Sequence, residues 1–93
     1  MPKECPECGR ALEELVQEIR KMTARNHLAT DVAAKMEHEL QEAITEANKD
    51  PQDLKLILAK LNGARALVEG VASASGLLPN IAETITLVKS HLP

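Results

Sequence analysis

PQDLKLILAKLNGARALVEGVASAS, residues 51–75, is the stretch that decides the fold of this chain. Apolar residues recur in it every three or four positions, which is the period of one face of an α-helix. These positions are Leu54, Ile57, Leu61, Ala64, Val68 and Val71. Leu56, Leu67 and Ala74 fill much of the remaining arc, and a helix that is apolar nearly all round is normally buried. The sequence therefore predicts that this segment is the central helix of a small bundle.

A second stripe, made of small residues, runs beside the first one with the same helical spacing. Its members are Ala59, Gly63, Ala66, Gly70 and Ser73. Because small side chains let another helix backbone approach closely, we expect this face to be a packing surface. Its partner is either the last helix of the same chain or a second copy of the chain. We favour a homodimer, because so small a monomer can cover only part of the strip.

Three further segments show helical periodicity, and together they predict an all-α, up-down bundle of about four helices over residues 10–93. Residues 10–26 form one amphipathic helix, with Asn26 suited to a left-handed end. Thr30 or Asp31 can cap a second helix that runs to about residue 49. Since no Gly or Pro separates the two segments, one long helix over residues 10–49 is the alternative.

The expected ends of the third and fourth helices follow from turn-forming residues. Asp50 before Pro51 predicts a capped start for the third helix, and Gly76 is expected to end it. Asn80 and Glu83 have the spacing of a capping box for the last helix.

The amino-acid composition excludes several classes of function. The 93 residues form one domain with no Phe, Tyr or Trp, so stacking recognition of single-stranded nucleic acid has no platform. A net charge of −3 gives no general attraction to nucleic acid or anionic lipid, and no segment is apolar enough to span a membrane. The polar N-terminus with its two cysteines predicts a reducing, cytoplasmic location.

Residues 1–9 are predicted to form a turn, which contains the two cysteines in the sequence Cys5-Pro6-Glu7-Cys8-Gly9. These are the residues of the chain best suited to bind a metal ion. Two thiolates three positions apart in a proline-stiffened turn can bind one Zn²⁺. The CPxCG pattern resembles the knuckle of zinc-ribbon and rubredoxin-like proteins. That resemblance covers five residues and implies a structural zinc, although those families have a second CxxC and this chain has no third cysteine.

The remaining zinc ligands have three candidate sources. His91 is the best placed histidine, because the fourth helix of an up-down bundle returns toward the start of the first, whereas His27 and His38 lie away from that end. Two chains could instead each donate Cys5 and Cys8 to one Cys₄ site, an arrangement that resembles the zinc hook of SMC-like repair ATPases. A partner protein is the third source.

The sequence thus predicts a non-enzymatic, zinc-binding helical protein that acts in self-association or binds another protein. A thiol redox sensor or oxidoreductase using Cys5 and Cys8 is the alternative, because Cys8 lies at a helix N-terminus that favours the thiolate. The Cys-Pro-x-Cys spacing also resembles the glutaredoxin motif, but the chain lacks the strand that precedes it there. A nucleic-acid-binding regulator is the third hypothesis, and the acidic charge disfavours it.

Overall fold

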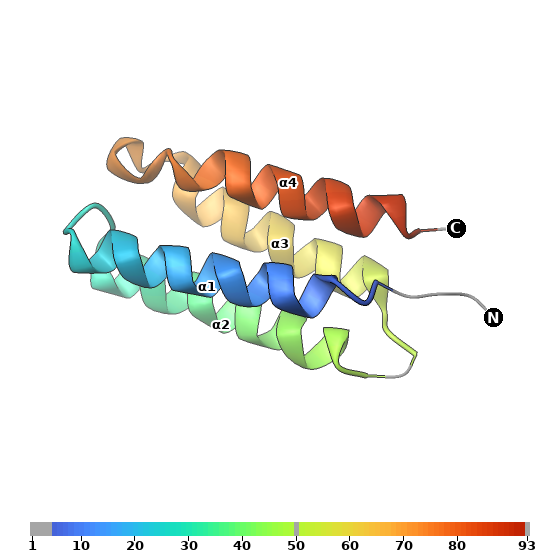
Figure 1. Cartoon of the computed structure of the whole chain (residues 1–93). Helices are drawn as coiled ribbons and strands as arrows, with labels where there is room; N and C mark the ends of the chain where they lie inside the picture. The colour runs from blue at the N-terminus through green and yellow to red at the C-terminus, as the bar shows by residue number, and fades with distance from the viewer. Residues whose placement is uncertain (1–4, 50, 93) are drawn as a thin grey trace.

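The fold is a bundle of four α-helices, in a computed structural model that describes residues 5–49 and 51–92 (Figure 1). The helices are α1 (Cys8–Ala24), α2 (Thr30–Ala47), α3 (Leu54–Glu69) and α4 (Leu77–Ser90), with a short 3₁₀ turn, η1 (Ala72–Ala74), between α3 and α4. The described residues contain no β-strand. The predicted all-α, four-helix bundle is therefore confirmed.

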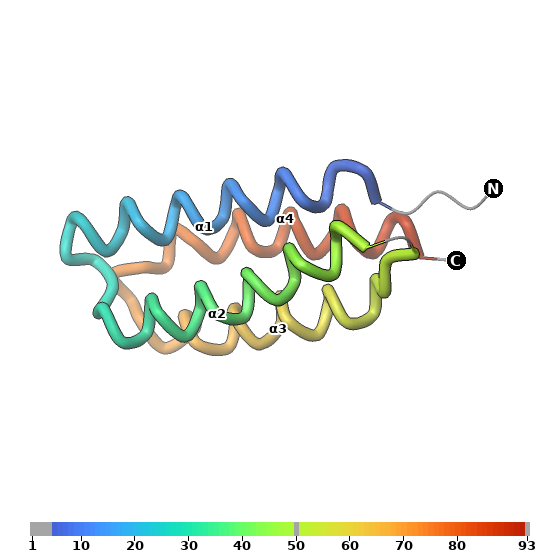
Figure 2. Tube along the Cα trace, turned by 90° about the horizontal axis from the view of Figure 1, so that it is seen from below, coloured from blue at the N-terminus to red at the C-terminus, as the bar shows by residue number. Residues whose placement is uncertain are grey.

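The helices form a ring in which consecutive helices are neighbours and α1 closes against α4. Successive helices run in opposite directions, so the topology is up-down-up-down (Figures 1 and 2). The molecule is elongated along the helix axes, with extents of 44 × 19 × 17 Å. As a consequence, the N-terminal turn and the end of α4 lie at the same end of the bundle (Figure 2).

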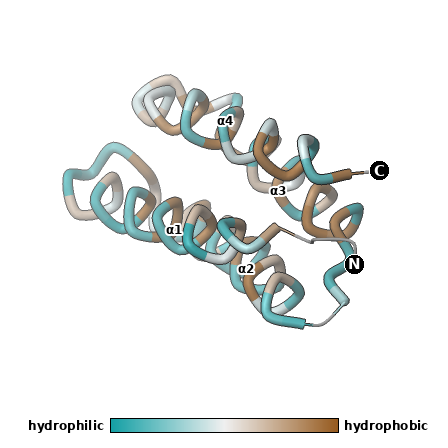
Figure 3. Tube along the Cα trace, turned by 45° about the vertical axis from the view of Figure 1, so that its right-hand side comes forward, coloured by the Kyte–Doolittle hydropathy of each residue, from teal (hydrophilic) through white to brown (hydrophobic). Residues whose placement is uncertain are grey.

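The core lies on the axis between the four helices, and each helix contributes one aliphatic face (Figure 3). Fully buried large side chains include Leu12 and Ile19 from α1, Met36 from α2, Leu61 from α3 and Ile81 from α4. Burying an aliphatic side chain contributes about 1.5–3 kcal/mol, so these faces supply the hydrophobic stabilisation of a core without aromatic residues.

The prediction that residues 51–75 form the central, buried helix of the bundle is wrong. α3 buries one face, Leu58 and Leu67 beside that face are partly buried against the core, and the opposite side, which includes Leu56, is exposed. In a ring of four similar helices no helix occupies the axis, so each helix leaves half of its circumference to solvent. Ala and Gly residues can be exposed on that half at little cost in free energy. Their presence there makes the sequence of α3 resemble that of a buried helix, although half of the helix is exposed.

Residues 10–49 form a hairpin and not one long helix. α1 ends at Ala24, and Asn26 adopts the left-handed conformation with φ 61°, as its residue type predicts. The N–H of His27 then closes the turn on the carbonyl of Met22 at 2.9 Å. α2 begins at Thr30 after Ala29, so neither Thr30 nor Asp31 occupies the N-cap position.

Two predicted helix boundaries in the second half of the chain are wrong. α3 begins at Leu54, capped by the Asp53 carboxylate, which accepts from the N–H of Leu56 at 3.1 Å. Pro51 therefore lies before the helix, and the predicted Asp50 cap lies outside the described residues. α3 also ends at Glu69, before η1, and not at Gly76.

The predicted capping box at Asn80 and Glu83 is also wrong. α4 begins at Leu77, so Pro79 lies in its first turn and Asn80 lies inside the helix. Proline is tolerated in a first turn because the N–H groups there have no partner within the helix. Pro79, which in the sequence suggests a break before the helix, is consequently part of α4.

Candidate functional site

The N-terminal turn is packed into the end of the bundle. Cys5 and Cys8 form a disulfide, and both residues are fully buried within the hydrophobic core. Cys8 is the first residue of α1, and its N–H donates to the carbonyl of Cys5 at 3.2 Å. The two sulfur atoms therefore belong to the core and do not form a projecting knuckle.

Gln52, in the loop between α2 and α3, holds this turn in place. Its Oε1 accepts from the backbone N–H of Cys5 at 2.7 Å, and its Nε2 donates to the carbonyl of Cys5 at 3.2 Å. The same Nε2 also donates to the carbonyl of Ala47 at the end of α2. This side chain of the α2–α3 loop thus pairs with backbone groups of two other segments, the cysteine turn and the end of α2. The sequence carries no signal for this role, because Gln52 and Cys5 are 47 residues apart.

Glu46 organises the same loop from inside the bundle and is only 7% exposed. Its Oε2 accepts from the N–H of Asp53 at 3.0 Å, and its Oε1 lies 3.2 Å from the Nζ of Lys49. A buried carboxylate requires such partners, because burying it alone is costly. Glu46 and Gln52 together fix the connection that supports the cysteine turn.

The predicted zinc ligands are only partly brought together. His91 does return to the N-terminal end, where its Nε2 lies 3.9 Å from Oε1 of Glu7. However, no three His, Cys, Asp or Glu side chains in residues 5–49 and 51–92 form a group that could hold a metal ion. A structural zinc requires four ligands, so the described part of one chain does not fit a zinc site. The two-chain Cys₄ site stays a prediction.

The other two histidines lie away from this turn. His27 is exposed in the connection between α1 and α2, where its carbonyl accepts from the Ser73 hydroxyl at 2.7 Å. His38 is exposed on α2, with its Nε2 3.2 Å from Oε2 of Glu42.

The small-residue stripe of α3 faces outward. Ala59, Ala66 and Gly70 are exposed and Gly63 is partly exposed, so the last helix does not cover this face. The stripe ends at Gly70, directly after α3, because Ser73 belongs to η1 and its hydroxyl donates to the carbonyl of His27. The prediction that α4 packs on the stripe is therefore wrong. The predicted contact with a second copy of the chain stays a prediction.

A hollow of about 430 Å³ opens beside Gly63, between α2 and α3. It is lined by Ala34, Lys35, His38, Glu39, Gly63 and Leu67. A Cβ atom at Gly63 would lie 3.3 Å from the Oε1 of Glu39, so the missing side chain contributes to the hollow.

Next to the hollow, Lys60 of α3 forms ion pairs with Glu42 and Glu39 of α2. The hydrogen bond from Lys60 lowers the pKa of the Glu42 carboxyl below its ordinary value, assisted by the positive charges of Lys60 and His38. The same hydrogen bond raises the pKa of Lys60. This cluster ties α2 to α3.

Comparison of the chain with protein-family models, with curated proteins and with solved structures finds no match. None of the helices in the described residues is long and apolar enough to cross a bilayer.

Proposed function

We propose that this protein is a non-enzymatic helical interaction module that associates with a second copy of itself through the outer face of α3. The α3 face consists of Leu56, Ala59, Gly63, Ala66 and Gly70. The observation that carries the proposal is Leu56, which is 39% exposed and is the exposed large hydrophobic residue of the described chain. Leu56 and the exposed Ala59 and Ala66 lie along one side of α3, and a continuous exposed apolar strip of this kind is a feature of association surfaces.

The α3 face is suited to pairing with itself. Leu56 projects from it, and the hollow at Gly63 lies two helical turns away, which is about 10 Å along the axis. Ala59 lies between them and allows close approach of two helices. In an antiparallel pair with a two-fold axis near Ala59, Leu56 of each copy would enter the Gly63 hollow of the other. Such a contact is isologous and closed, as in most homodimers.

The strength of this association is limited by area. A stable dimer buries about 800 Å² on each partner, so the contact must include the neighbouring flank of α2 as well as α3. That flank carries the Lys60–Glu42 pair, which is already neutralised within one chain. We therefore expect a reversible dimer with a Kd roughly in the micromolar range.

Native mass spectrometry and sedimentation over a concentration series test this proposal. Two matched variants give the sharpest comparison, because Ala66 on the α3 face and Ala82 on α4 are both exposed helical alanines. Ala66→Lys should shift the equilibrium to monomer, whereas Ala82→Lys should leave it unchanged. Leu56→Ser should also weaken the dimer. A wild-type chain that stays monomeric at millimolar concentration, or equal effects of both lysine variants, would exclude the α3 face as the interface.

A thiol–disulfide response is a second candidate function, and the Cys5–Cys8 disulfide favours it. Reduction by a dithiol would place two thiols in the core and remove a short cross-link, which the chain-entropy account values at about 2 kcal/mol. Burial opposes the thiolate form, so the pair is better suited to a slow structural response than to oxidoreductase catalysis.

Thiol counting separates this candidate from the predicted two-chain zinc site. A disulfide leaves no reactive thiol until a reductant is added, with or without a chelator. Zinc-bound thiolates react only after chelation, and metal analysis would then find about one zinc for two chains. Free thiols in the untreated protein, without bound metal, would contradict both.

A further inference from the structure

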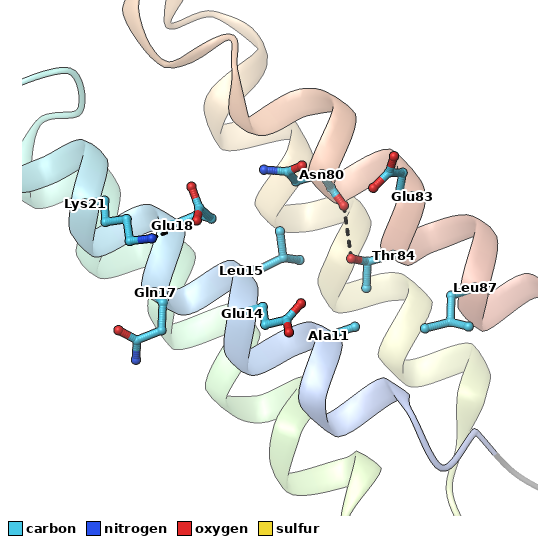
Figure 4. Close-up of a pocket in the computed structure, with 10 residues that line it drawn as sticks. All are labelled: Ala11, Glu14, Leu15, Gln17, Glu18, Lys21, Asn80, Glu83, Thr84 and Leu87. Carbon is cyan, nitrogen blue, oxygen red and sulfur yellow. Dashed lines mark hydrogen bonds and ion pairs between the residues drawn. The ribbon is translucent and has the colours of Figure 1, made fainter.

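A groove of about 460 Å³ runs between α1 and α4, on the side of the ring opposite the α2–α3 hollow (Figure 4). α1 and α4 are the neighbouring helices that no loop joins directly, so only side chains close this seam. The groove is lined by Ala11, Glu14, Leu15, Gln17, Glu18, Lys21, Asn80, Glu83, Thr84 and Leu87.

The floor of the groove is aliphatic. Leu15 and Thr84 are buried at its base, and Ala11 and Leu87 are partly buried toward one end (Figure 4). The hydroxyl of Thr84 donates to the carbonyl of Asn80 at 3.0 Å, so it is already satisfied. The floor therefore offers methyl groups to an incoming side chain.

The walls of the groove are acidic. Glu14 and Glu18 come from α1, and Glu83 comes from α4 on the opposite wall (Figure 4). The amine of Lys21 is the positive group of the lining, and it lies 3.3 Å from Oε2 of Glu18. Glu14 and Glu83 form no ion pair with any residue of the described ranges. A carboxylate thus remains available on each wall.

We propose that this groove docks a basic amphipathic helix of a partner protein. Lining residues on α1 extend from Ala11 to Lys21, which is about 15 Å, or between two and three turns of a docked helix. Apolar side chains of that helix would contact the floor, and lysine or arginine side chains on both sides would reach Glu14 and Glu83. This is the helix-in-groove mode of recognition, with electrostatic complementarity at the rim.

The negative charge of the groove walls favours a basic helix over other ligands. Three carboxylates repel phosphate, which excludes the nucleic-acid backbone. Within residues 5–49 and 51–92 the carboxylates do not form a metal-binding group, so a single divalent cation does not match the site. A partner bound here leaves the α3 face free, and the inference therefore does not depend on self-association.

The test uses the full chain and two 14-residue helical probe peptides. The first carries leucines at every third or fourth position, flanked by lysines, and the second has glutamate in place of each lysine. Fluorescence anisotropy at low and at physiological salt measures binding to the wild type, to Glu14→Gln/Glu83→Gln and to Glu13→Gln. Glu13 is the matched control, because it is exposed on the same helix and does not line the groove.

We expect the lysine peptide to bind and the glutamate peptide not to bind. The double variant should weaken binding by about tenfold or more, with Glu13→Gln within about twofold of the wild type. The wild-type affinity should fall as salt rises. Amide chemical shifts should move along α1 and α4, and thermal unfolding should show that both variants are folded. Ala66→Lys should bind the lysine peptide as the wild type does.

Several outcomes would overturn the inference. The first is absence of binding to the lysine peptide, and the second is equal binding of the two peptides. The third is a loss of affinity in Glu13→Gln equal to that in the double variant, which would indicate that net charge alone causes the binding. Full displacement of the peptide by an equal concentration of spermine would make the groove a general cation site.

Discussion

The side-chain amide of Gln52 pairs with both backbone polar groups of Cys5, accepting from its N–H at 2.7 Å and donating to its carbonyl at 3.2 Å. The pairing resembles that between two β-strand backbones, but here a side chain supplies one of the two partners. It explains how a turn of few apolar residues is held against the bundle.

Replacement of Gln52 should therefore loosen the N-terminal turn. Gln52→Ala leaves the N–H and carbonyl of Cys5 without this partner, and a loss of this kind costs about 1–3 kcal/mol. Urea unfolding should show the decrease in stability, and hydrogen exchange at the Cys5 amide should accelerate. Gln41→Ala, at an exposed position of α2, is the control and should have little effect. Equal stabilities of the two variants would mean that the disulfide alone fixes the turn.

Glu46 provides a second test of the same end of the bundle. Glu46→Ala removes the acceptor for the N–H of Asp53 and opens a small space in the core, so we expect a loss of about 1–3 kcal/mol in the free energy of unfolding. Glu46→Gln keeps an acceptor oxygen and should lose less. A glutamine variant as unstable as the alanine variant would show that the charge, and not the hydrogen bond, is required.

The Lys60–Glu42 pair predicts a small, two-sided dependence of stability on pH. Because the pKa of Glu42 is lowered in the folded chain, its contribution is present above the pKa of an unfolded glutamate and is lost as pH falls through the folded value. The pKa of Lys60 is raised, so its contribution is present below the unfolded lysine pKa and is lost as pH rises through the folded value. Both groups are solvent-exposed, and screening keeps the effect small.

Carboxyl titration by NMR checks this pair directly. Lys60→Gln should return the pKa of Glu42 toward its ordinary value, whereas Lys55→Gln, at an exposed position on the same helix, should not change it. A Glu42 pKa that is insensitive to Lys60 would show that the pair does not form in solution.

The conformation and surroundings of Gly70 lead us to expect that an alanine there stabilises the chain. Its φ of −89° is accessible to any residue, and a Cβ atom there would meet no atom within 4 Å. Gly70→Ala should therefore stabilise the monomer by about 0.4–1 kcal/mol, because it restricts the unfolded chain. Chemical denaturation at low protein concentration measures this, and destabilisation there would indicate that Gly70 packs closely against another surface. Close packing of Gly70 against another part of the described chain is not found.

The sequence left open whether residues 10–49 form one helix or two, because no Gly or Pro separates the two segments. Periodicity was sufficient for the all-α class and the amphipathic faces of the helices, and residue type indicated the left-handed Asn26. These features depend on residues within one or two turns of each other, so local pattern contains the information. Helix ends were less predictable, because Pro51 and Pro79 can each stand before a helix or in its first turn, and tertiary packing selects between these positions.

The sequence by itself determined an all-α chain of amphipathic helices with two cysteines in a tight N-terminal turn, because spacing and turn chemistry are local properties. Only the tertiary structure decided that α3 is a peripheral helix, that Gln52 holds the cysteine turn while Glu46 orders the α2–α3 loop, and that Glu14 and Glu83 line one groove. These relationships join residues far apart in the chain, and they arise from how four similar helices share one core.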